Sequence, residues 1–74
     1  MDCLEFIRRE LLLTKPQMYR ALGWSRQRYH KPRDLGSVDS ALRHSKKLAA
    51  ALNGVSEARI LNLIKAYIAN HVNY

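Results

Sequence analysis

The chain has few of the residues that form disulfides, metal sites or phosphate-binding loops. Its 74 residues include one cysteine, Cys3, so no disulfide can form within the chain and a reducing compartment is expected. The three histidines, His30, His44 and His71, lack the spacing of metal ligands, and no glycine-rich phosphate loop is present. We therefore expect no metal, no other cofactor, no small-molecule ligand and no enzymatic activity.

Strand-forming and membrane-spanning patterns are also missing. Two prolines, three glycines and few clusters of β-branched residues leave little material for a sheet. No apolar run reaches the length of a membrane-spanning helix, and no signal-peptide pattern is present. We expect an all-α cytoplasmic protein with no membrane partner.

Negative charge is scarce, and positive charge is concentrated in one part of the chain. Thirteen Lys and Arg residues against six Asp and Glu residues give a formal net charge of +7 and a pI near 10.1. Residues 11–33 hold none of the acids. Such a field favours polyanionic partners, of which duplex DNA is the first candidate. The six acids are Asp2, Glu5, Glu10, Asp34, Asp39 and Glu57.

Apolar residues recur at helical spacing in five segments, which predicts a compact five-helix bundle forming one domain over residues 1–74. In the first segment, Ile7 and Leu11 share a stripe that Phe6 and Leu12 widen. The expected helices cover residues 2–12, 15–22, 25–31, 38–52 and 57–71. The stripe of the fourth helix consists of Val38, Ala41, Leu42, Ser45, Leu48, Ala49 and Leu52.

The second and third helices have well-marked ends. Thr14 begins a capping box, and Gly23 is placed to end the second helix in a left-handed conformation. Ser25 is a good cap for the third helix, which Pro32 must stop. A capped helix, a tight turn and a second capped helix form the layout of a helix-turn-helix, here over about residues 15–31.

The third helix carries side chains suited to base recognition. The guanidinium fork of Arg26 can bond O6 and N7 of guanine, and the Gln27 amide can bond adenine. Arg28 could reach a base or a phosphate. Tyr29 is expected to pack against Trp24 in the core rather than stack on a base.

The helix expected over residues 57–71 is apolar on two sides. A bundle of this size has one core to fill, so the second stripe predicts a homodimer interface. A small basic DNA reader gains affinity from two half-sites, which also favours a dimer. The core stripe is Ile60, Leu63, Ile64 and Tyr67, and the interface stripe is Leu61, Ile68 and Val72.

Three short runs, taken in order, resemble the phage repressor and Cro-type (lambda-repressor-like) helix-turn-helix family. They are Ile7-Arg-Arg-Glu-Leu11 ahead of Thr14, then Ala21-Leu-Gly-Trp-Ser25, then Leu48-Ala-Ala-Ala-Leu52 before Gly54-Val-Ser56. The resemblance covers nearly the whole chain. It implies a five-helix fold with the third helix in the major groove of DNA.

The resemblance also assigns roles to individual residues. The base-contacting residues would be Arg26, Gln27, Lys31 and Arg28. Lys15 matches a phosphate anchor of the family, and the expected phosphate contacts are Lys15, Arg20, Arg33, Ser25 and His30. A second basic group on the fourth helix either extends the DNA footprint or is a solvated face; its members are Arg43, Lys46 and Lys47.

Two departures from the family leave a second hypothesis open. Tyr19 stands where the family has a small residue, and Pro32-Arg33 stands where it has an apolar anchor followed by an acid. The favoured hypothesis is a sequence-specific double-stranded DNA-binding transcription regulator, a phage or prophage repressor acting as a homodimer on a palindromic operator. Such a regulator is expected in the cytoplasm of a bacterial host cell, associated with the nucleoid. The alternative is a small phage-type protein-binding module that inhibits a host DNA-binding or polymerase component.

Overall fold

The computed structural model describes residues 3–29 and 38–71. Both parts are helical and contain no strand, which confirms the predicted all-α bundle. The helices are α1 (Cys3–Glu10), α2 (Lys15–Leu22), α3 (Arg26–Tyr29), α5 (Val38–Ala51) and α6 (Glu57–His71). The predicted bounds of α2 and α6 are confirmed, and α5 ends one residue before the predicted end.

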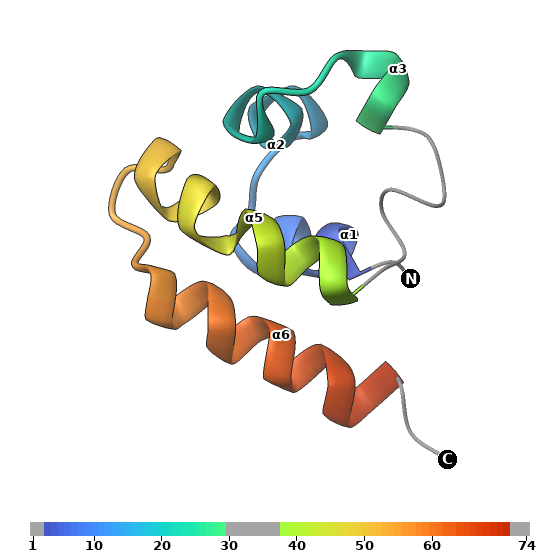
Figure 1. The fold of residues 1–74 in the computed structure, drawn as a ribbon, viewed down its shortest axis with the longest axis vertical. Coiled ribbons are helices and arrows are strands. Elements are labelled where there is room, and N and C mark those ends of the chain that lie inside the picture. The colour runs from blue at the N-terminus through green and yellow to red at the C-terminus, as the bar shows by residue number, and fades with distance from the viewer. Residues whose placement is uncertain (1–2, 30–37, 72–74) are drawn as a thin grey trace.

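The helix-turn-helix lies at one end of the molecule. In Figure 1, α2 and α3 stand at one end of the long axis, α6 lies across the opposite end, and α1 and α5 fill the space between them. The principal extents are 33 × 27 × 20 Å. The predicted DNA-reading helix and the predicted dimer helix therefore lie on opposite sides of α1 and α5.

Every described helix contributes to one core. The largest fully buried side chains include Tyr29 from α3, Met18 and Leu22 from α2, and Leu48 from α5. Among the described residues of α3, Tyr29 is the one that is buried in that core. The remaining buried apolar residues are Cys3, Leu4, Ile7, Ala21, Trp24, Ala41, Ile60, Ile64 and Tyr67.

The first helix is shorter than its sequence predicts, and Leu12 does not join its stripe. The prediction extended the helix to residue 12, but α1 ends at Glu10. Leu12 takes a left-handed backbone with φ 58° and is 90% exposed. The chain reverses at this residue, so Leu11 and Leu13 turn back toward the core while the Leu12 side chain points to solvent.

The stripe predicted for the fourth helix is too wide. Ala41, Ser45 and Leu48 are buried in α5, but Leu42 is 47% exposed. A step of one residue from Ala41 turns the side chain by about 100° around the helix, and that is enough to place Leu42 outside the contact with the other helices. The buried Ser45 hydroxyl donates to the Leu42 carbonyl oxygen at 2.9 Å.

Helix α6 buries one of its two apolar stripes in the core and leaves part of the second exposed to solvent. Ile60, Ile64 and Tyr67 are buried, as predicted. Of the predicted interface residues, Leu61 is half-buried against the core and Ile68 is 42% exposed. Val72 lies outside the described residues. None of the helices in the described parts is long and apolar enough to cross a bilayer.

Candidate nucleic-acid interface

Reciprocal caps fix the start of α2. The Thr14 hydroxyl accepts a hydrogen bond from the Gln17 backbone N–H at 3.2 Å, and the Gln17 side-chain oxygen accepts from the Thr14 N–H at 2.8 Å. This is the predicted capping box, with Pro16 in the first turn. The result is a rigid helix start that leaves the side chain of Lys15 exposed.

The end of α2 and the start of α3 form the tight turn of the motif. Gly23 has φ 73°, the left-handed conformation that the sequence predicts for it. The Ser25 hydroxyl then caps α3 by accepting from the Arg28 N–H at 3.1 Å. Arg26, Gln27 and Arg28 of α3 are exposed.

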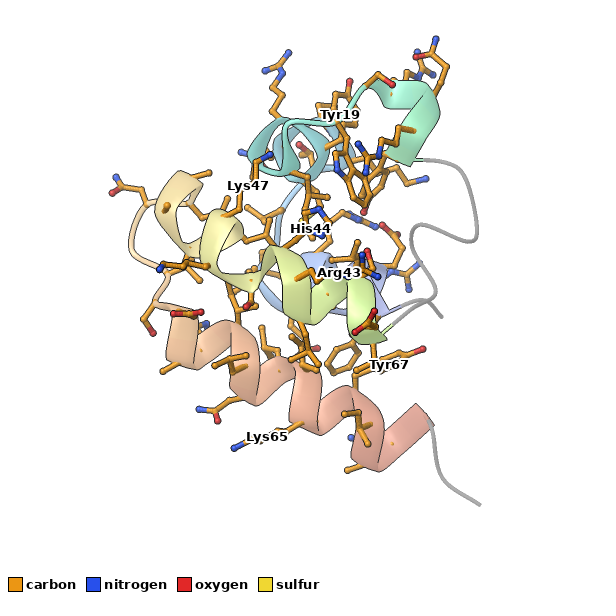
Figure 2. All side chains as sticks on the ribbon, in the orientation of Figure 1. Tyr19, Arg43, His44, Lys47, Lys65 and Tyr67 are labelled. Atoms are coloured by element: carbon orange, nitrogen blue, oxygen red, sulfur yellow. The ribbon has the colours of Figure 1, made fainter. Side chains whose placement is uncertain are left out.

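The side chain of Lys47, on α5, lies close to this turn. A Cβ added to Gly23 would lie 2.8 Å from Lys47 Nζ, so the ammonium group sits at the C-terminal end of α2. Cations are favourable there because the last carbonyls of a helix carry partial negative charge. Figure 2 shows Lys47 reaching from α5 toward α2. Arg43, in contrast, pairs with Asp39 at 2.7 Å on the exposed face of α5.

Tyr29 anchors α3 to α1. Its ring is 1% exposed, and its hydroxyl donates a short hydrogen bond to the Glu5 carboxylate. The same carboxylate accepts two bonds from the Arg8 guanidinium, each 2.8 Å long. Arg8 also donates to the Leu13 carbonyl oxygen at 2.8 Å. These bonds tie α3, α1 and the chain before α2 into one unit.

The charges of this network are fixed near neutral pH. The hydrogen bonds from Arg8 lower the pKa of Glu5 to about 2, although partial burial acts in the opposite direction; the bond from Tyr29 lowers it further. Burial raises the pKa of Tyr29, and its bond to the Glu5 carboxylate raises it further. Glu5 is therefore a carboxylate and Tyr29 a neutral donor near neutral pH.

An aromatic cluster supports α3 from the side of α2 and α5. The Tyr29 ring centroid lies 6.5 Å from that of Trp24 and 6.1 Å from that of Tyr19. Trp24 in turn meets His44 of α5 edge-on at 5.1 Å. The predicted packing of Tyr29 on Trp24 is confirmed. Tyr19 is accommodated by packing against the Tyr29 ring, with an angle of 54° between the two ring planes.

Trp24 also orients Arg28. The Arg28 guanidinium carbon lies 4.5 Å from the centroid of the Trp24 ring, which is a cation–π contact. The contact holds the guanidinium beside Trp24, which precedes the N-terminal end of α3.

A shallow groove separates the exposed sides of α2 and α3. It has a volume of about 400 Å³ and is lined by Lys15, Pro16, Tyr19 and Arg26. Lys15 and Tyr19 are four residues apart and so share one face of α2, while Arg26 approaches from the start of α3. Two cations and no acid line this groove, and a phosphate group is the kind of ligand they attract.

The structure brings some of the predicted contact residues together and separates one of them. Lys15 and Arg26 line the same groove, with Ser25 capping α3 beside them. Arg20 lies on another side of α2, about 140° around the axis from Lys15, where it lines a different groove. The residues outside the described parts are His30, Lys31 and Arg33.

The sequence patterns do not mark two residues of this region, Tyr19 and Glu5, as part of the site. Tyr19 is noted in the sequence only as a departure from the family, and Glu5 only as an acid of the first helix. Tyr19 could have been found from its i+4 spacing to Lys15. Glu5 carries no such signal, because its partner Tyr29 is 24 residues further along the chain.

No protein-family model, curated protein or solved structure matches the chain. Over the described residues, the structure contains no group of three His, Cys, Asp or Glu side chains that could hold a metal ion. Assignments of function therefore depend on the geometry of the α2–α3 surface and on its charge.

Proposed function

We propose that this protein is a sequence-specific transcription regulator that binds double-stranded DNA with α3 in the major groove. The observation that carries the proposal is the groove between α2 and α3, where Lys15 and Arg26 converge from two capped helices with no acid between them. Phosphate contacts at such a surface set the orientation of a protein on the duplex. The net charge of +7 adds long-range attraction to the same partner.

Base recognition falls to the outer side of α3. Arg26 and Gln27 are exposed there, and both side chains can make paired hydrogen bonds to base edges in the major groove. Tyr29 and its bond to Glu5 hold the opposite side of the helix in the core. A helix pinned on one side and exposed on the other presents its side chains in a fixed direction, which direct readout requires.

The regulator is proposed to act as a homodimer on a palindromic operator, because two half-sites supply the affinity that one small domain lacks. The exposed Ile68 of α6 supports a dimer contact on that helix. Repression, and a phage or prophage source, rest on the resemblance of the helix-turn-helix and its flanking runs to phage repressors and Cro proteins.

Fluorescence anisotropy with a labelled random-sequence duplex tests the proposal. We expect binding at about 50 mM salt that weakens steeply toward about 200 mM, as counterion release requires. The double variant Lys15→Ala/Arg26→Ala should lose most of that binding. Its matched control, Arg59→Ala/Lys65→Ala, removes the same charge from α6, the helix that lies opposite α2 and α3 in Figure 1, and should bind nearly as the parent does.

Selection of bound sites from a random DNA pool then tests sequence specificity. Recovery of an inverted repeat would support both base readout and dimer formation. If the two double variants lose affinity equally, the binding is unspecific charge attraction. If the parent does not bind DNA at low salt, the protein-binding alternative replaces the proposal.

A further inference from the structure

Tyr19 carries a hydrogen-bond donor that the protein itself does not use. The residue is half-buried and lines the groove between α2 and α3, and its hydroxyl makes no hydrogen bond with any residue in the described parts of the chain. No buried polar side-chain atom in those parts lacks a partner, so the unpartnered hydroxyl must reach solvent. It is therefore available to an acceptor that comes from outside the molecule.

Packing limits the movement of this hydroxyl. The Tyr19 ring lies 6.1 Å from the Tyr29 ring, with 54° between the two ring planes. Tyr29 is itself 1% exposed and bonded to Glu5, so it gives Tyr19 a fixed support. A tyrosine has two side-chain torsions between its backbone and its rigid ring, and contact with a fixed neighbour restricts both. A donor that is already ordered loses little entropy when a ligand binds it.

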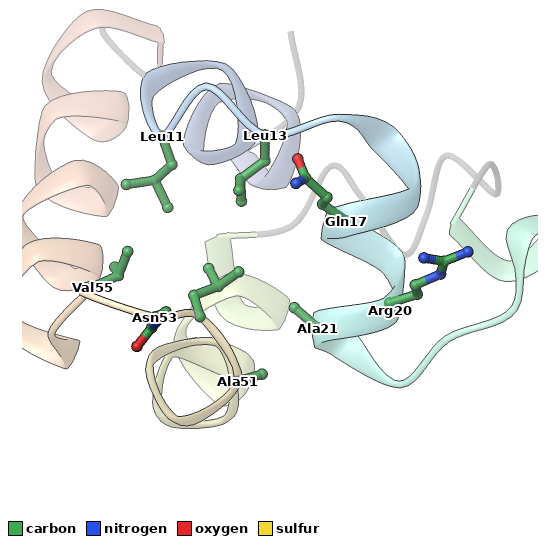
Figure 3. Close-up of a pocket in the computed structure, with 9 residues that line it drawn as sticks. Leu11, Leu13, Gln17, Arg20, Ala21, Ala51, Asn53 and Val55 are labelled. Carbon is green, nitrogen blue, oxygen red and sulfur yellow. The ribbon is translucent and has the colours of Figure 1, made fainter.

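Lys15 is the cation that shares a face of α2 with Tyr19. The two residues are one turn apart, and Lys15 is exposed and forms no ion pair with a residue that the structure describes. Arg20 lies on another side of α2, where it lines a separate groove with Gln17 and Ala21 (Figure 3). One face of α2 thus presents an ammonium group and a hydroxyl donor, and no acid lines the groove beside them. An oxyanion is the ligand that uses both groups.

We propose that Lys15 and Tyr19 together hold one backbone phosphate of DNA, Lys15 through its charge and Tyr19 through a hydrogen bond from its hydroxyl. A backbone phosphate fits better than a free anion, because it carries a deoxyribose on each side and the groove offers the apolar surface of Pro16 and of the Tyr19 ring. Tyrosine hydroxyls are among the groups that bond DNA phosphates. Arg26, across the groove, stays available for a base. This inference rests on the proposed function and adds a contact residue to it.

Fluorescence anisotropy with a labelled random-sequence duplex, repeated between about 50 and 200 mM salt, tests this contact. Tyr19→Phe removes a hydroxyl and no charge, so it should raise the Kd about five- to tenfold and leave the salt slope unchanged. Lys15→Ala should also raise the Kd, but with a slope reduced by about one unit. Tyr67→Phe is the matched control, because it removes a hydroxyl from α6, opposite α2 and α3 (Figure 1), and should bind as the parent does.

The double variant Lys15→Ala/Tyr19→Phe tests whether both side chains hold the same phosphate. If they do, the combined loss of affinity should be smaller than the product of the two single losses, because the second substitution acts on a contact that the first has already weakened. Thermal unfolding of Tyr19→Phe, with a midpoint close to that of the parent, would show that the loss of affinity is not a loss of fold.

The outcomes separate this inference from the proposed function. If the parent binds DNA and Tyr19→Phe binds equally well, the Tyr19 contact is excluded while the proposed function stands. Single losses that multiply in the double variant would assign the two side chains to separate phosphates and overturn the shared site. A parent that does not bind the duplex at low salt would overturn both.

Discussion

The hydroxyl of Tyr29 donates a hydrogen bond to the carboxylate of Glu5, joining α3 to α1 across 24 positions of the chain. Of the described residues of α3, Arg26–Tyr29, Tyr29 is the one buried against the rest of the molecule. This bond and the aromatic cluster around Tyr29 therefore hold the described part of α3 in place.

Tyr29→Phe removes this hydrogen bond while keeping the ring. We expect a loss of about 1–3 kcal/mol in the free energy of unfolding, since the acceptor is charged and stays partly buried. Urea denaturation followed by circular dichroism measures it. Tyr19→Phe, on a half-buried ring, is the control and should change stability by less than about 0.5 kcal/mol. Equal losses for the two variants would show that the Glu5 bond adds nothing.

Acid should destabilise the protein through Glu5. Its folded pKa of about 2 lies below the ordinary value of 4.5, so the unfolded chain binds more protons between these two values. The contribution of Glu5 is complete above about pH 5 and is lost as pH falls toward 2; with allowance for solvent screening it is roughly 1–2 kcal/mol. Urea midpoints between pH 7 and pH 2.5 measure this change.

Glu5→Gln should flatten that acid limb, because the amide does not titrate. Glu57→Gln, an exposed acid at the start of α6, should leave the limb as steep as in the parent. If Glu5→Gln and the parent lose stability equally between pH 5 and pH 2.5, another carboxylate governs the acid response.

Gly23 and Gly54 form a natural pair for measuring the constraint on the turn. Both have left-handed backbones (φ 73° and 77°), so an alanine at either position should cost about 1–2 kcal/mol. An alanine at Gly23 also meets Lys47 Nζ, whereas nothing lies within 4 Å of one at Gly54. Thermal unfolding should therefore show Gly23→Ala as slightly the worse, and Lys47→Ala should remove the difference. A large difference that persists without Lys47 would mean that another contact constrains the turn.

Arg26 and Lys15 should respond differently in DNA binding. Arg26→Ala is expected to cost about 1–3 kcal/mol on a selected operator and to relax preference at one base pair. Lys15→Ala should weaken all sequences evenly and reduce the salt slope of binding by about one unit. Anisotropy titrations on the operator and on single-base variants separate the two effects. The reverse pattern would exchange the roles of these residues.

The structure shows which substitution on α6 tests the predicted dimer interface without disturbing the core. Ile68 is 42% exposed, so Ile68→Glu should leave the fold intact and lower the mass measured by light scattering if α6 forms the dimer. Leu61 is half-buried against the core, and Leu61→Glu would disturb the fold as well as any interface. An unchanged mass for Ile68→Glu would exclude the α6 contact.

Local signals predicted the helix-turn-helix well. The bounds of α2, its capping box, the left-handed Gly23 and the Ser25 cap all follow from residues within a few positions of one another. Such motifs satisfy the free backbone groups at helix ends, and their chemistry is visible in the sequence. Periodicity likewise located α5 and α6, whose apolar stripes are long.

Long-range contacts and unusual helix ends could not be predicted. The sequence does not show that Tyr29 reaches Glu5, because that contact depends on how α3 and α1 pack. The apolar pattern places Leu12 in the stripe of the first helix. A leucine, unlike a glycine, does not indicate that the backbone turns left-handed and the helix ends there. The helices that carry Leu42 and Arg20 were predicted correctly. Which side of each helix the other elements cover depends on tertiary packing, and the sequence does not show it.

An NMR titration of the isotope-labelled protein with a duplex carrying the selected operator tests the central claim most directly. Binding through the α2–α3 surface predicts amide shifts concentrated at Lys15–Gln17 and at Ser25–Arg28, with the signals of α6 around Arg59 and Lys65 nearly unchanged. Shifts centred on α6, or no shifts at low salt, would contradict the assignment of α3 as a DNA-reading helix.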